Sequence, residues 1–240
     1  MTQIAILNSQ THRDLRVEPK VSARYGDDQR FVPVVITEFS LLAVHYPILL
    51  SKDAETGAFY CGVMLGFDVG ENLFLDEGKG QDGYRPLNLR RAPFYTAGPD
   101  LAVDLDHPRV GAAAGQRVFD DKGQPTPYLE GVFAVMRDLQ PGVEMTKVFV
   151  QTLLSLKLVE AVSIDVGFDD GTTRDLQGLY TIDQAALRAL PDAAVLDLFR
   201  RGYLQLIYLM VASIKQVPIL ARRKNLRLLE PDGALAGQFA

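Results

Sequence analysis

The spacing of apolar residues changes near Asp120, and this change constrains the fold more than any other feature of the sequence. Before that point, apolar residues form short runs, such as residues 31–36 and 58–67, separated by turn-forming residues. Runs of roughly four to eight residues predict β-strands. After it, apolar residues recur at the spacing of a helix with one buried face. The sequence therefore predicts an α+β protein, with a β-rich antiparallel N-terminal half packed with a mainly helical C-terminal half that carries one β-hairpin.

Turn residues place the strands. Residues 47–51 and 58–67 flank a turn-rich connection, and residues 161–168 and 172–180 flank Asp169-Asp170-Gly171. A glycine after an aspartate supplies the positive φ of a tight hairpin, so the second pair is the clearest hairpin. Pro33 lacks an N–H group, so the run at 31–36 is expected at a sheet edge or a strand start. Further strands are expected at 72–75, 94–96 and 101–105, and a glycine-rich loop at 78–83.

The helices of the second half begin after a proline-containing turn at 121–127. Thr126 can cap a helix that has Pro127 in its first position. We expect Pro141-Gly142 to interrupt this helix and a second one to follow at 148–156. Asp183 is expected to cap a helix over 184–190, and a long last helix is expected to run from Pro191 to Ile214. The two sub-lobes are then 1–120, which is β-rich, and 121–220, which is helical with the hairpin, followed by a tail at 221–240.

Composition excludes several classes of protein. The net charge of -5, from 25 basic and 30 acidic residues, opposes a nucleic-acid binder, which needs an electropositive face. The single cysteine, Cys61, lies in an apolar run and is expected to be buried, and a chain with one cysteine suits a reducing cytosol. The most apolar stretch, 203–214, is shorter than the roughly 20 residues of a membrane-spanning helix. Because the N-terminus has no signal-peptide pattern, we expect a cytoplasmic protein without integral membrane segments. Surface association would need leaderless secretion.

Motifs that carry chemistry are missing from the sequence. It contains no phosphate-binding loop, dinucleotide fingerprint or nucleophile elbow. His12-Arg13-Asp14 matches the start of a two-histidine, one-carboxylate iron site, but it lies in a polar, turn-like segment and is interpreted as structural. We therefore predict no catalytic residue, no metal site and no cofactor. The sequence leaves open whether the chain is an enzyme, although the lack of catalytic motifs favours a protein that is not an enzyme.

Paired arginines are the least ordinary polar feature. Arg90-Arg91 and Arg200-Arg201 lie among apolar residues, and neighbouring helical residues point about 100° apart, so one arginine of each pair would face inward. A buried arginine needs a partner, for which Glu71, Asp76 and Glu38 are available. Two interpretations stay open, namely structural ion pairs or a site for an anion. The candidate ligand- or partner-binding residues are Tyr84, Arg90, Arg91, Glu71, Asn72, Arg201 and Tyr203. A further basic run at 222–224 is interpreted as the solvated end of a helix.

Short blocks along almost the whole chain resemble the SapC family of bacterial proteins. These blocks are residues 12–17, 32–34, 38–39, 46–48, 66–67, 70–74, 90–94, 119–120, 123–126, 178–180, 183, 190–191 and 200–208. The pattern weakens after Ser213. Because the blocks run through both sub-lobes, the resemblance implies one family unit over 1–240.

The resemblance implies a role rather than a reaction. The family name comes from a surface-layer locus, and related genes often lie beside those for outer-membrane receptors, halogenase-like proteins and cupin-like oxygenases. It implies a non-catalytic, soluble accessory or binding protein that acts with such a system, with a protein, a peptide or a small anionic ligand as partner. Two alternatives stay open, a surface-layer-associated structural protein and an enzyme on a small or peptidic anionic substrate. The oligomeric state is not predicted.

Overall fold

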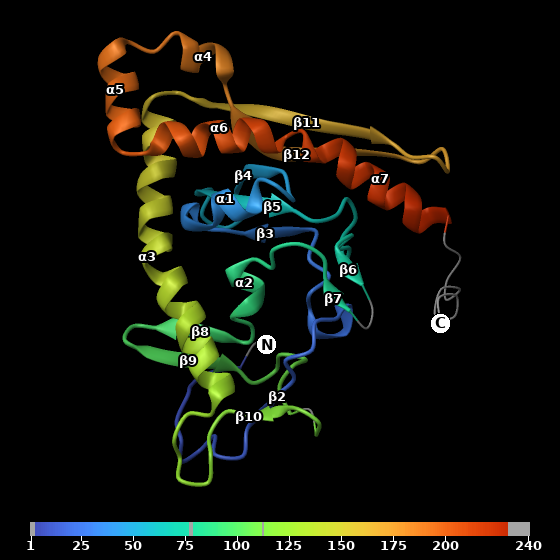
Figure 1. The fold of residues 1–240 in the computed structure, drawn as a ribbon, viewed down its shortest axis with the longest axis vertical. Coiled ribbons are helices and arrows are strands. Elements are labelled where there is room, and N and C mark those ends of the chain that lie inside the picture. The colour runs from blue at the N-terminus through green and yellow to red at the C-terminus, as the bar shows by residue number, and fades with distance from the viewer. Residues whose placement is uncertain (1–2, 77–78, 112, 230–240) are drawn as a thin grey trace. The chain divides into compact units, whose positions relative to one another are not determined.

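The computed structural model describes residues 3–76, 79–111 and 113–229 (Figure 1). The chain forms two compact units, and each is discontinuous in sequence. Unit 1 contains residues 1–29 and 74–144, and unit 2 contains residues 30–73 and 145–240. The chain therefore passes from one unit to the other at 29/30, 73/74 and 144/145, whereas its composition changes near Asp120.

Unit 1 is built on a three-stranded antiparallel sheet with the strand order β1-β9-β8. The strands are β1 (Ile4–Ile6), β9 (Asp100–Asp104) and β8 (Phe94–Ala97), and the expected strands at 94–96 and 101–105 are confirmed as a hairpin. Two-stranded ladders join β2 (Arg16–Val17) to β10 (Gln116–Arg117) and β6 (Leu75–Asp76) to β7 (Gly80–Gln81). The short helices are η1 (Ala23–Tyr25) and α2 (Leu87–Arg90). The core of the unit contains Val17, Phe94, Val103, Val118, Leu129, Val132 and Met136.

Two expectations in unit 1 need correction. The strand expected at 72–75 is wrong in most of its length, because pairing begins only at Leu75. The loop expected at 78–83 contains the short strand β7, and its first residue, Gly78, lies outside the described residues.

Unit 2 contains a five-stranded antiparallel sheet with the strand order β11-β12-β4-β5-β3. Its strands are β3 (Phe31–Pro33), β4 (Ile48–Lys52), β5 (Phe59–Met64), β11 (Val159–Gly167) and β12 (Thr173–Ile182). Both predicted hairpins are confirmed, and Gly171 has the expected positive φ of 82°. Pro33 lies on the edge strand, as its missing N–H group predicts. The fold is therefore α+β, as expected.

Among its described residues, unit 2 contains six further short or medium-length helices besides its part of α3. They are η2 (Ile36–Glu38), α1 (Phe39–Leu42), α4 (Gln184–Arg188), α5 (Asp192–Arg200), α6 (Tyr203–Ser213) and α7 (Gln216–Leu229). The Asp183 carboxylate accepts hydrogen bonds from the backbone N–H groups of Ala185 and Ala186, so the predicted cap is confirmed. The single long helix expected from Pro191 to Ile214 is wrong. Gly202, with a φ of 73°, separates α5 from α6 because a left-handed residue cannot continue a right-handed helix.

The expected interruption at Pro141 is also wrong, because α3 is one helix from Pro127 to Ser155. Buried residues recur at helical spacing along its length, at positions 129, 132, 136, 139, 142, 146, 149 and 153. Pro141 lies on the exposed side of this stripe. Gly142 and Thr146 continue the stripe without being apolar, which hid the continuity from the sequence pattern. Helix α3 belongs to both units, since the division falls at 144/145.

Helix α7 makes residues 221–229 of the expected tail helical, while residues 230–240 lie outside the described residues. By length and composition alone, the helical stretch Tyr203–Leu229 would be able to cross a membrane. The expectation that the apolar segment is too short considered only residues 203–214. A core helix of a soluble protein passes the same test, so this length is weak evidence for a membrane span.

Candidate functional site

The predicted binding residues are divided between the two units. Tyr84, Arg90 and Arg91 belong to unit 1. Glu71, Asn72, Arg201 and Tyr203 belong to unit 2. The two groups have different surroundings, and only one of them adjoins a cleft that has arginine donors without a partner.

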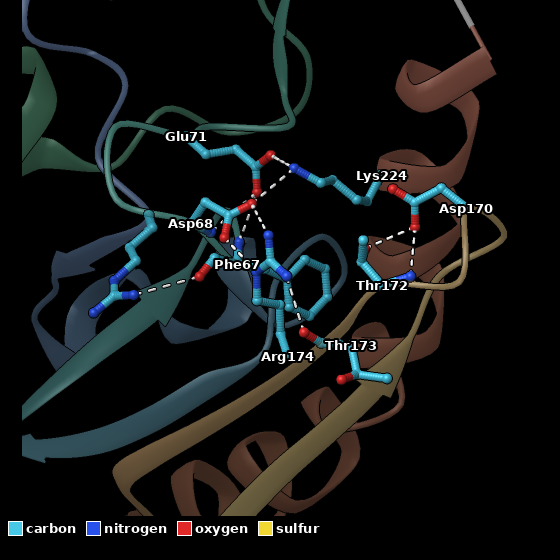
Figure 2. A network of polar contacts seen from close by, with 9 residues as sticks. Phe67, Asp68, Glu71, Asp170, Thr172, Thr173, Arg174 and Lys224 are labelled. Atoms are coloured by element: carbon cyan, nitrogen blue, oxygen red, sulfur yellow. Dashed lines mark hydrogen bonds and ion pairs between the residues drawn. The ribbon is translucent and has the colours of Figure 1, made fainter.

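In unit 2, Glu71 belongs to a cluster of ion pairs (Figure 2). Its carboxylate pairs with the Lys224 ammonium group and accepts a hydrogen bond of 2.8 Å from the backbone N–H of Phe67. The Asp68 carboxylate accepts hydrogen bonds from Lys224 Nζ at 2.9 Å and from Arg174 Nε at 2.6 Å. Two carboxylates therefore meet two cations, and we interpret the cluster as structural.

The same cluster corrects two expectations. Residues 222–224 were interpreted as a solvated helix end. The Lys224 side chain is instead only 14% exposed, and its ammonium group forms ion pairs inside unit 2. Burial alone would lower the pKa of Lys224, but its hydrogen bonds to Glu71 and Asp68 more than offset this and raise it. Glu71 was offered as a partner for a buried arginine, and its cation is this lysine instead.

Arg201 has partners within unit 2. Its guanidinium group lies 4.3 Å from the centre of the Tyr203 ring and 3.3 Å from the Asp197 carboxylate, and it donates a hydrogen bond of 3.2 Å to Thr152 Oγ1. The Tyr203 ring packs edge-on against Phe149. Asn72 is buried. These contacts favour the structural interpretation for the predicted residues of unit 2.

In unit 1, the two adjacent arginines differ. The Arg91 side chain is partly buried, donates from Nε to Asn88 Oδ1 at 2.7 Å, donates from Nη1 to the Phe94 carbonyl at 2.6 Å, and stacks on Tyr95. Burial lowers the pKa of Arg91. Arg90 is exposed, and its guanidinium group has no hydrogen bond or ion pair with any residue that the structure describes. The Arg91 guanidinium is thus bonded within unit 1, whereas the Arg90 guanidinium is available to bind a ligand.

Arg90 lines a cleft of about 310 Å³, which we call the arginine cleft. Its lining residues are Pro19, Arg85, Arg90, Ala92, Arg109, Pro127, Tyr128, Gly131, Val132 and Val135. The end of α2 supplies Arg90, and the first turns of α3 supply the apolar wall and Tyr128. Tyr84, although predicted, is not a lining residue. The cleft therefore combines basic and apolar side chains and contains no carboxylate among its lining residues.

One carboxylate serves both of the other cleft arginines. Asp27, only 1% exposed, accepts from Arg85 Nη2 at 2.7 Å and from Arg109 Nη2 at 2.5 Å. Arg109 Nη1 donates to the carbonyl groups of Glu18 and Lys20, at 2.8 and 2.7 Å. Arg109 is itself only 2% exposed. The outer nitrogens of these guanidinium groups are thus largely used within the unit.

The Nε atoms of these two guanidinium groups, by contrast, make no hydrogen bond within the described part of the unit. Arg85 Nε and Arg109 Nε are buried and have no hydrogen-bond partner among the described residues. A buried N–H group without a partner costs about 1–3 kcal/mol. The Tyr128 hydroxyl has no hydrogen bond to a described residue either. Burial raises the pKa of Tyr128 to about 12, although Arg109 and Arg85 act in the opposite direction, so the phenol stays protonated and can donate. The donors that a ligand in the cleft can reach are the exposed Arg90 guanidinium and the Tyr128 hydroxyl, whereas Arg85 Nε and Arg109 Nε are buried.

Sequence reasoning found Arg90 and missed the rest of the cleft. Asp27, Arg85 and Arg109 lie in three segments that are far apart in the chain and have no motif spacing. The only local signal was that Arg85 and Arg109 each adjoin a proline, which indicates an ordered loop. Their convergence is a property of the folded unit.

Other candidates for chemistry are weak in the described part of the chain. It contains no group of three or more histidine, cysteine, aspartate and glutamate residues that could hold a metal ion. Cys61 is buried as expected, and burial raises the pKa of its thiol to about 12.

A comparison with protein families gives one match. The family model described as SapC matches residues 7–220. No curated protein and no solved structure matches the chain significantly. Every lining residue of the arginine cleft lies inside the matched range, whereas Lys224 of the ion-pair cluster lies beyond it.

Proposed function

Because this chain belongs to the SapC family, we propose that it is a non-catalytic, cytoplasmic accessory protein that binds an anionic group in the arginine cleft. The anion belongs to a protein or peptide partner, or to a small ligand, of the receptor, halogenase-like or oxygenase systems that the family resemblance implies. The observation that carries the proposal is the exposed Arg90 guanidinium, which lines the cleft and has no acidic partner among the described residues.

Charge supports the same conclusion. Arg85 and Arg109 share the single carboxylate of Asp27, and Arg90 has no acidic partner in the described chain. A buried cation is stable only when it is paired and its hydrogen bonds are made. An anion in the cleft would supply an acceptor for the Arg90 guanidinium, and arginine forks match carboxylate and phosphate oxygens well.

The lining residues support binding rather than catalysis. None of them is a serine, cysteine, histidine, aspartate or glutamate, which are the usual nucleophiles and bases. Tyr128 is the one lining residue with a neutral acidic group, and with a pKa of about 12 it serves as a donor at neutral pH. The cleft can therefore hold and orient an anion, while chemistry on it would need groups from elsewhere.

Backbone amide NMR with acetate and inorganic phosphate as separate probes tests this proposal. We expect shifts that saturate with concentration and that concentrate at residues 90–92 and 128–132. Arg90→Gln, at an exposed position, should weaken them by about fivefold or more. Arg137→Gln removes the same charge from an exposed position of α3 outside the cleft and should leave them unchanged. Shifts that are scattered over the surface, or that are equal in wild type and Arg90→Gln, would overturn the proposal.

A further inference from the structure

We infer that the arginine cleft is built for a phosphate monoester group, a tetrahedral dianion, carried on a small apolar body. This inference rests on the proposed anion-binding function and names the class of anion. It follows from three properties of the cleft, which are its charge, the placement of its donors and the apolar character of its wall.

Charge favours a dianion over a monoanion. Three arginines line the cleft, and Asp27 is the only carboxylate in contact with them among the described residues. The three guanidinium groups and the Asp27 carboxylate together leave an excess of two positive charges at the cleft. A carboxylate ligand would neutralise one of them, whereas a phosphate monoester, with a charge of about -1.5 to -2 at pH 7, would neutralise both. Charges interact more strongly in such a partly desolvated site than in bulk water, so the second negative charge of the ligand should increase its affinity for the cleft.

The donors also suit a tetrahedral group. They come from two separate segments, with the exposed Arg90 guanidinium at the end of α2 and the Tyr128 hydroxyl in the first turn of α3. A carboxylate presents two oxygens in one plane. A phosphate monoester presents three terminal oxygens in three directions and can accept from donors that approach from different sides. The Tyr128 hydroxyl adds a neutral donor on the side of α3.

The apolar wall provides for the organic part of the ester. Ala92, Pro127, Val132 and Val135 line the cleft beside the arginines. Its volume of about 310 Å³ lies at the lower end of small-molecule sites, which span roughly 300–1,000 Å³. The cleft therefore fits a small ester or the phosphorylated end of a larger ligand, and these two sources share the same chemistry.

Isothermal titration calorimetry of the full chain with phenyl phosphate, benzoate and inorganic phosphate tests the inference. At pH 7.5 we expect phenyl phosphate to bind about tenfold or more tightly than benzoate, which carries the same ring on a monoanion. Phenyl phosphate should also bind more tightly than inorganic phosphate because of the apolar wall. Its affinity should fall several-fold at pH 5, where the second phosphate proton, with a pKa near 6, is bound.

Variants and a second ligand complete the design. Arg90→Gln and Tyr128→Phe should each weaken phenyl phosphate binding by about fivefold or more, and Arg137→Gln should not, with thermal melts confirming that all three variants are folded. A phosphotyrosine peptide identifies the source. Binding tighter than that of phenyl phosphate indicates a phosphorylated partner, and weaker binding indicates a free ester.

The outcomes separate the two proposals. If benzoate binds as tightly as phenyl phosphate and Arg90→Gln weakens both, the dianion inference is overturned and the anion-binding function stands. If no anion binds, or if Arg90→Gln and Tyr128→Phe bind like wild type, both proposals fail.

Discussion

Replacing Asp27 by asparagine tests the central contact of the arginine cleft. The substitution keeps the size of the side chain and removes its charge. An asparagine has one oxygen, so it can accept from only one of Arg85 and Arg109, and its NH₂ group then faces the other guanidinium group. The change leaves two buried or half-buried cations without a carboxylate.

The expected cost follows from burial. Asp27 is 1% and Arg109 is 2% exposed, and the contacts are 2.7 Å to Arg85 and 2.5 Å to Arg109. Removing one partner of a buried ion pair costs about 3–5 kcal/mol. A protein of this size loses roughly 2–4 °C in Tm per kcal/mol, so Asp27→Asn should melt about 6–20 °C below wild type.

Circular dichroism melts at pH 7.5 measure this shift, with Asp76→Asn as the matched control. Asp76 also pairs with a cation, Lys79 at 3.3 Å, but both side chains are exposed, and such pairs contribute less than about 1 kcal/mol. Added phosphate should raise the Tm of Asp27→Asn if the variant retains the cleft. A Tm within about 2 °C of wild type for Asp27→Asn would refute the ion-pair reasoning.

Four further predictions concern the rest of the chain. Lys224→Gln should lower the free energy of unfolding by about 1–3 kcal/mol in urea, because it leaves Glu71 and Asp68 short of a cation. The hydrogen bond from Arg174 lowers the pKa of the Asp68 carboxylate, so this pair contributes stability above the unfolded pKa near 3.9 and loses it as the pH falls through the lower folded pKa. An acid titration without a loss of stability in this range would count against the pair. Gly66→Ala should destabilise by about 1–3 kcal/mol, because its Cβ would lie 2.4 Å from the Glu71 carbonyl oxygen, whereas Gly131→Ala in α3, with nothing within 4 Å, should be neutral or stabilising in the same urea experiment. Cys61, with a thiol pKa of about 12, should resist iodoacetamide at pH 8 until the protein unfolds, and rapid labelling of the native protein would contradict its burial.

The sequence predicted elements whose causes are local. Both hairpins, the Asp183 cap and the edge position of Pro33 follow from residues that lie within a few positions of one another. The helix errors arose where one residue was weighed without its surroundings. Pro141 is tolerated because it lies on the exposed side of α3, whereas Gly202 ends a helix because its φ is positive.

The site was predictable only in part for the same reason. Arg90 stands out because it adjoins a second arginine among apolar residues. The contact of Asp27 with Arg85 and Arg109 joins three loop segments and leaves no periodic trace. Glu71 was correctly singled out as a residue in need of a cation, but its partner comes from α7, far along the chain.

The discontinuity of the units has a consequence for synthesis on the ribosome. Strands β3, β4 and β5 emerge early, but β12, the neighbour of β4 in the sheet, follows only after the whole of unit 1 has been made. During that interval the backbone groups on one edge of β4 have no strand partner, and such an edge can pair with other chains. Unit 1 is complete once residue 144 has emerged, so the first-formed hairpin belongs to the unit that is finished last. A nascent chain that has released β4 and β5 but not yet β12 should therefore be more prone to aggregation than the complete chain, and should depend more on a chaperone.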